Sequence, residues 1–134
     1  MITKLRRMTL LVKDQAEALK FYTEKLGFEK RADNEFWGGK RWITVAPKGQ
    51  KELEILLEPT SWFEGEDRKK KEMVVGNQPI GVFETDDCEK TYQQFIKNGV
   101  KSVFAPKEQM WGIEARLEDL YGNEFSLLQP NPGM

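Results

Sequence analysis

Apolar and polar side chains alternate in short segments along this chain, and the segments are separated by Gly, Pro and Asn residues. Such alternation is typical of strands that bury one face. The pattern predicts eight strands, four in each half of the chain. They cover Leu5–Val12, Phe28–Asn34, Arg41–Ala46, Glu52–Glu58, Ile80–Thr85, Val100–Ala105, Gly112–Leu117 and Glu124–Gln129. The segments 37–39 and 48–50 have the glycines expected of turns.

Two further segments carry helix signals at both ends. Asp14 and Asp86 are each followed three residues later by a glutamate, a spacing that favours an N-terminal capping box. Gly27 and Gly99 follow at a suitable distance and can close a helix in the left-handed conformation. The sequence therefore predicts helices over Gln15–Leu26 and Asp87–Asn98.

These signals repeat at an offset of 72 residues, as from Asp14 to Asp86 and from Gly27 to Gly99. A repeat of this length indicates two modules with one plan. We expect a single domain over residues 1–134, with modules at about 1–59 and 79–130. The segment 60–78 between them is polar and contains a run of charges, so it is predicted to be a solvated loop.

Composition excludes several classes of function. The 134 residues include 21 basic and 22 acidic side chains, so no strong field attracts nucleic acid or an anionic membrane. No apolar stretch approaches the roughly 20 residues needed to cross a bilayer. The single Cys88 cannot form an internal disulfide, and Met1–Arg7 lacks the apolar run of a secretory signal. A cytoplasmic protein with neither nucleic-acid nor membrane partners is predicted.

Several short motifs carry a family resemblance. Leu11-Val12-Lys13-Asp14, Phe21-Tyr22 and Lys25-Leu26-Gly27-Phe28 are echoed in the second half by Thr85-Asp86-Asp87, Asn98-Gly99-Val100 and Asp119–Phe125. In this order the chain resembles the vicinal-oxygen-chelate superfamily of glyoxalases, bleomycin resistance proteins and extradiol dioxygenases. Leu120-Tyr121 departs from the Pro-Asp usual there. The resemblance implies an α+β fold, in which two tandem βαβββ modules form curved mixed sheets around a cavity with helices outside, and a homodimer.

Strand alternation in that fold selects the side chains that would face the cavity. The interior would be partly apolar with a few charges, as in many pockets for small organic ligands. The predicted ligand-binding residues are Arg7, Thr9, Trp42, Glu54, Leu56, Ile80, Glu114, Arg116 and Ser126. Trp62 falls in the predicted loop and is left outside this set.

The resemblance also locates the positions that hold a metal in metal-dependent relatives. They align with Arg7, Glu54, Ile80 and Ser126, of which only Glu54 is a suitable ligand. The chain has no histidine, so a site of two histidines and a carboxylate cannot be built. We predict that no metal and no other cofactor is bound.

Two functional classes remain open at this point. The first is metal-free binding or sequestration of a small organic compound, as in bleomycin resistance proteins. The second is an atypical metal-independent lyase or isomerase, with Glu54, Glu84 or Glu114 as general base. Arg7 and Glu54 either form the positive centre of a ligand site or a purely structural ion pair. The sequence does not identify the ligand.

Overall fold

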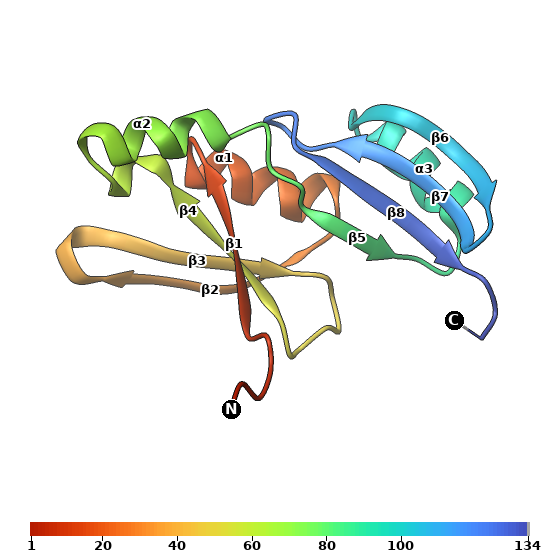
Figure 1. Ribbon diagram of the computed structural model, residues 1–134, viewed down its shortest axis with the longest axis horizontal. Helices are drawn as coiled ribbons and strands as arrows, with labels where there is room; N and C mark the ends of the chain where they lie inside the picture. Colours follow the sequence, from red (N-terminus) through yellow and green to blue (C-terminus); the bar gives the residue numbers. More distant parts are fainter. Residues whose placement is uncertain (134) are drawn as a thin grey trace. The chain divides into compact units, whose positions relative to one another are not determined.

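Each half of the chain forms its own four-stranded mixed sheet, as a computed structural model that describes residues 1–133 shows (Figure 1). The chain divides into two compact units, residues 1–75 and the residues from Gly76 onward. Both units follow the order strand, helix and three strands. The predicted α+β fold of tandem βαβββ modules is confirmed.

The sheet of the first unit has the strand order β1-β4-β3-β2. Strand β1 runs parallel to β4, while β3 is antiparallel to both of its neighbours. The strands are β1 (Arg7–Val12), β2 (Glu29–Phe36), β3 (Lys40–Ala46) and β4 (Glu54–Pro59). All four predicted strands of this module are present, with ends that differ by one or two residues.

The first helix changes its winding partway along. Helix α1 (Gln15–Lys20) starts at Asp14, whose side chain accepts the Glu17 N–H at 2.9 Å. It continues as a π-helix over Phe21–Lys25, where the Thr23 hydroxyl donates to the Leu19 carbonyl at 2.7 Å. A hydroxyl bonded back into the preceding turn competes with regular helical hydrogen bonds. The predicted helix is present, but its second half is more widely wound than expected.

The second unit repeats this plan with the strand order β5-β8-β7-β6. Its elements are β5 (Gly81–Glu84), α3 (Cys88–Lys97), β6 (Lys101–Gln109), β7 (Gly112–Glu118) and β8 (Glu124–Pro130). The helix cap corrects the sequence prediction: Asp87, not Asp86, accepts the Lys90 N–H at 3.0 Å. Two consecutive aspartates made the position ambiguous, and the helix starts after the second.

The segment between the modules is not the predicted loop. It contains a short 3-10 turn, Thr60–Trp62 (η3), and helix α2 (Gly65–Val74). The charge run that suggested a loop forms pairs along one helix instead, Lys71–Asp67 at 3.2 Å and Arg68–Glu72 at 3.6 Å, both four residues apart. Such pairs support an exposed helix without a buried face. The prediction failed because polarity reports solvent exposure and not the absence of helix.

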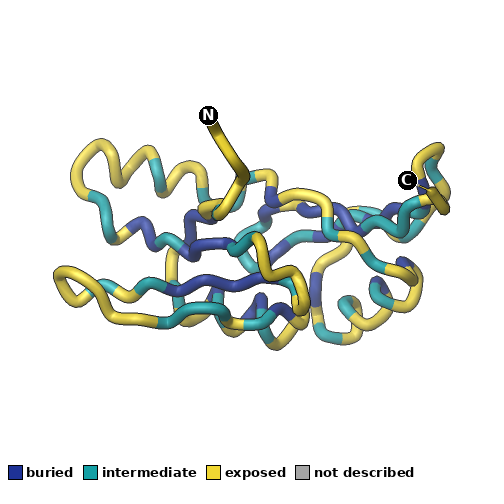
Figure 2. The backbone as a smooth tube through the Cα atoms, turned by 90° about the horizontal axis from the view of Figure 1, so that it is seen from below, coloured by how far each residue is buried: buried dark blue, intermediate teal, exposed yellow. Residues whose placement is uncertain are grey.

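Buried side chains follow the middle strands, while the hairpin ends are exposed (Figure 2). Helix α1 contacts β3 and β4, and α3 contacts β6, β7 and β8. In the first unit the most buried strand residues include Val12, Val45 and Leu57; in the second they include Leu117, Phe125 and Leu127. Among the described residues, no helix has the length and apolar character needed to cross a membrane.

The registers of the two sheets correct one correspondence between the modules. Val45 pairs with Ile55, whereas Leu117, 72 residues after Val45, pairs with Phe125, only 70 residues after Ile55. The turn before β8 is thus two residues shorter than the turn before β4. Glu54 therefore corresponds to Glu124, and Ser126, which was aligned with Glu54, corresponds to Leu56.

Candidate functional site

One face of the first sheet gathers the candidate residues of that module. Arg7 lies opposite Glu54 on neighbouring strands, and Leu56 lies between Thr9 and Thr44. Since alternate residues of a strand share a face, Trp42 and Glu58 belong to the same side. We call this the first inner face, made of Arg7, Thr9, Trp42, Thr44, Glu54, Leu56 and Glu58. The opposite face carries the aliphatic side chains of the core.

Arg7 is the centre of this face. Its Nε lies 3.3 Å from Glu54 Oε1, and its guanidinium carbon lies 5.0 Å from the centre of the Trp42 ring. The Arg7 and Glu54 side chains are 33% and 26% exposed, so solvent only partly screens the pair. A guanidinium fixed by a carboxylate and an aromatic face still has N–H donors for an anion. The structure thus brings three predicted residues together.

A row of aromatic rings extends from Trp42. Phe36 packs edge-on against Trp42, with ring centres 5.8 Å apart, and against Trp62, with ring centres 5.5 Å apart. Edge-to-face packing holds aromatic rings in defined orientations. Sequence reasoning missed both Phe36 and Trp62, since the predicted strand ended at Asn34 and segment 60–78 was assigned to a loop. The concentration of aromatic residues around the first hairpin was the available signal.

Glu58 is a second residue that the sequence prediction missed. It follows Glu54 and Leu56 on the same face of β4. Partial burial raises the pKa of its carboxyl above the usual value, although the Lys71 ammonium on α2 acts in the opposite direction. Continuing the alternation by one step along the strand identifies Glu58 from sequence.

Thr44 and Leu56 form the buried middle of the first inner face. Leu56 is 3% exposed and Thr44 is fully buried, while Thr9 beside them is exposed. Within residues 1–133, the Thr44 hydroxyl has no hydrogen-bond partner. A buried hydroxyl without a partner is uncommon and costs free energy.

The remaining candidates lie in the second unit, on its own sheet. Glu114 is 8% exposed, accepts the Trp111 Nε1–H at 2.8 Å and lies 3.7 Å from Arg116. Arg116 also lies 3.7 Å from Glu124 and against the Phe104 ring. The strand pairing places Ser126 beside both Val82 and Arg116.

Two candidates have less specific surroundings. Ile80 is buried, and its backbone N–H donates to the Glu124 carbonyl at 3.2 Å. Glu84 is exposed and pairs with Leu128 at the edge strand of the sheet. Neither environment by itself indicates catalysis. Of the three proposed general bases, Glu54 and Glu114 each lie beside an arginine.

The residues present do not fit a divalent metal. Imidazole ligands are absent from the whole sequence. Across residues 1–133, no three carboxylate or thiol side chains converge in a metal-binding arrangement. The two corresponding glutamates, Glu54 and Glu124, each have an arginine as neighbour, whose charge repels a cation.

Fold and site together define a class of tandem βαβββ proteins whose inner sheet faces carry the polar groups. Residues 4–127 match the sequence model of the Glyoxalase/Bleomycin resistance protein/Dioxygenase superfamily. The chain belongs to this superfamily.

Individual relatives cover nearly the whole chain. The protein YetH of Bacillus subtilis (strain 168) is 32% identical over 127 residues, which are 95% of this chain and 98% of YetH. The crystal structure of UcmS2 is 36% identical, covers 96% of this chain and 98% of UcmS2, and has a TM-score of 0.88. That of TnmS3, described as an antibiotic binding protein from Streptomyces sp. CB03234, is 32% identical, covers 97% and 98%, and has a TM-score of 0.80.

Proposed function

We propose that this protein binds and sequesters a small organic compound, without a metal, on the first inner face. The observation that carries the proposal is the position of Arg7, held by Glu54 at 3.3 Å and lying over the Trp42 ring at 5.0 Å. This arrangement offers a fixed cation next to an aromatic surface. An aromatic compound with a carboxylate or phenolate group would use both.

Two further observations support this proposal. The buried Thr44 hydroxyl has no partner among the described residues, and a ligand or a water on this face would supply one. The similarity to TnmS3, an antibiotic binding protein, favours a binding role over catalysis. We therefore rank sequestration above the alternative lyase or isomerase.

The test begins with a thermal-shift screen of aromatic acids, phenols and aromatic antibiotics, followed by calorimetry on each hit. Arg7→Met should leave the protein folded, because methionine keeps much of the side-chain packing. It should weaken an anionic hit by about 1.5 to 3 kcal/mol, the usual worth of a hydrogen bond to a charged group. Glu54→Gln should weaken binding less, since the guanidinium remains.

Arg68→Met is the matched control, because Arg68 lies on the exposed helix α2 and pairs only with Glu72. It removes the same charge away from the inner face. Unchanged affinity of a well-folded Arg7→Met protein would contradict the proposed role of Arg7. A strong loss of stability in Arg7→Met, with unchanged affinity at a temperature where it is folded, would show that the pair is structural.

We also propose that the chain acts in the cytoplasm as a homodimer. The support for dimerisation is the family resemblance, together with the unpaired edges of both open sheets, which proteins commonly cover. Sedimentation equilibrium at micromolar concentration should give twice the mass of one chain. A single species at the mass of one chain would contradict the dimer.

A further inference from the structure

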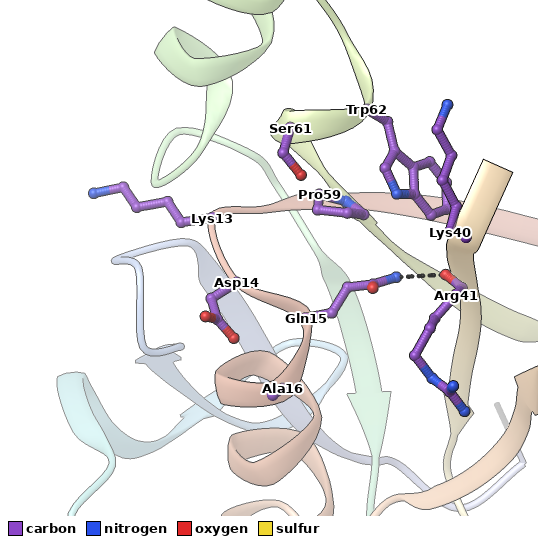
Figure 3. Close-up of a pocket in the computed structure, with 10 residues that line it drawn as sticks. Lys13, Asp14, Gln15, Ala16, Lys40, Arg41, Pro59, Ser61 and Trp62 are labelled. Atoms are coloured by element: carbon purple, nitrogen blue, oxygen red, sulfur yellow. Dashed lines mark hydrogen bonds between the residues drawn. The ribbon is translucent and has the colours of Figure 1, made fainter. Parts of the chain in front are cut away.

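A cleft of about 490 Å³ lies in the first unit, at the end of the sheet where the parallel strands β1 and β4 finish. Three connections meet there: the turn into α1, the β2–β3 hairpin and the 3-10 turn η3 (Figure 3). Its lining residues are Lys13, Asp14, Gln15, Ala16, Gly39, Lys40, Arg41, Pro59, Ser61 and Trp62. None of the residues to which the proposed ligand site was assigned lines this cleft.

The charges of the lining favour an anion. Arg41 is neutralised by Asp33, at 2.6 Å, and the Asp14 carboxylate caps α1. Lys13 and Lys40 remain, and among the described residues neither forms an ion pair with a carboxylate. The lining thus keeps an excess of positive charge after its internal pairs are counted.

Trp62 gives the cleft a flat apolar wall. Its ring is packed against Phe36, and the Lys40 ammonium lies 5.8 Å from its centre. Figure 3 shows the Trp62 ring and the Lys40 side chain next to each other, with Lys13 on the other side of the view. A ring held in place beside a cation can stack on a planar group while the cation binds an attached acid group.

The opposite part of the lining is held rigidly. The Gln15 amide donates to the carbonyls of Arg41 and Leu57, both at 2.9 Å, and so ties α1 to β3 and β4 (Figure 3). Ser61 adds a hydroxyl at the rim. A site whose walls are fixed before binding loses less conformational entropy when a ligand enters.

We propose that this cleft is a second binding site, for a small aromatic anion such as an aryl carboxylate or sulfonate. The ring would stack on Trp62 and the acid group would bind Lys40, with Lys13 adding a longer-range attraction. The site is independent of the Arg7 site, so either proposal can fail without the other.

The experiment uses 2-naphthoate as probe and follows the indole N–H signals of the full-length protein by two-dimensional NMR, with Trp62→Phe identifying the Trp62 signal. Titration should move the Trp62 signal to saturation. Lys40→Met should weaken binding by about three- to ten-fold and Lys13→Met by about two-fold. Raising the salt concentration from about 20 to 300 mM should also weaken binding, since these charges are screened.

Lys70→Met on helix α2 is the matched control and should bind as the wild type does. The neutral 2-naphthamide should bind more weakly than 2-naphthoate. The proposal is overturned if 2-naphthoate leaves the Trp62 signal unmoved at millimolar concentration, if it moves the Trp42 signal instead, or if Lys40→Met and Lys70→Met bind alike.

Discussion

The two modules carry a glutamate at the same place but hold it with arginines from opposite sides. In the first module, Glu54 on β4 pairs with Arg7 on the neighbouring parallel strand β1. In the second, Glu124 on β8 lies near Arg116 on the neighbouring antiparallel strand β7, while Ile80 occupies the place of Arg7. The repeated fold therefore keeps the positions of strands and lets the polar chemistry move between them.

The turn before the last strand shows a second contrast. In the second module Asn123 is fully buried, donates to the Asp119 carboxylate at 3.0 Å and accepts the Gln78 N–H at 2.9 Å. The longer turn of the first module is held from outside, by hydrogen bonds from Arg31 to the carbonyls of Pro47 and Gln50. A buried polar network tolerates less change than a partly exposed one.

The largest effect that we predict tests this contrast. Asn123→Ala should lower the free energy of unfolding by about 2 to 3 kcal/mol, because it leaves the buried Asp119 carboxylate and the Gln78 N–H short of a partner. Arg31→Met should cost about 1 kcal/mol or less. Urea denaturation of both variants measures the two values. Equal losses would mean that the two turns contribute alike.

Sequence predicted the plan of both modules because strand alternation, helix caps and glycine closures are local signals. The alternation along β1 and β4 likewise predicted that Arg7 lies beside Glu54, as the 3.3 Å contact confirms. The register between strands was not predictable in the same way. The two-residue difference between the turns is invisible to an ungapped repeat, so Ser126 was aligned with Glu54 in place of Glu124.

Two other features escaped because they depend on contacts distant in sequence. Trp62 becomes part of the aromatic row only when the chain after β4 returns to Phe36 at the hairpin. Helix α2 has no buried face, so it lacks the apolar period by which helices are recognised. Charge spacing at four residues was its only local signal.

A smaller effect concerns the two arginine–glutamate pairs. Arg7–Glu54 is shorter than Arg116–Glu124, at 3.3 Å against 3.7 Å, and its side chains are less exposed. A double-mutant cycle with Arg→Met and Glu→Gln should give a coupling of about 0.5 to 1 kcal/mol for the first pair and below about 0.5 kcal/mol for the second. A stronger coupling in the second module would contradict the ranking drawn from geometry.

Glu58 distinguishes the modules in its dependence on pH, since Leu128 stands at the corresponding position of β8. Burial raises the pKa of the Glu58 carboxyl, so the folded protein binds this proton more tightly than the unfolded chain does. The free energy of unfolding contributed by this group therefore falls as the pH rises from the unfolded-state pKa through the folded-state pKa. Glu58→Gln should be more stable than wild type at pH 7, and the advantage should vanish in acid.

Denaturation of both proteins between pH 4 and pH 8 measures this difference. The ionic attraction of Lys71 is the competing effect, because Glu58→Gln removes it. If wild type were the more stable protein at pH 7, and increasingly so as the pH rises, the attraction of Lys71 would outweigh the burial of Glu58.

The smallest predicted effect, a near absence of reaction, concerns the first residue of each helix. Gln15 and Cys88 both follow the capping aspartate, and both donate to a carbonyl of the last strand, Leu57 for Gln15 and Leu127 for Cys88. Burial, more than the nearby Glu89 carboxylate, raises the pKa of the Cys88 thiol. Since the thiolate is the reactive form, native Cys88 should react with Ellman's reagent at pH 8 hardly at all until the protein unfolds.

Moving the thiol to the other module makes the comparison direct. Gln15 lines the open cleft, so Gln15→Cys in a Cys88→Ala background should be labelled at least about ten times faster than native Cys88, because the reagent reaches it without unfolding. Labelling rates in native buffer, set against rates in denaturant, separate access from intrinsic reactivity. Rapid stoichiometric labelling of native Cys88 would show that the first turn of α3 opens readily. The two modules would then differ in the stability of their helix starts, and the weak bond from Cys88 to Leu127 would be the physical reason.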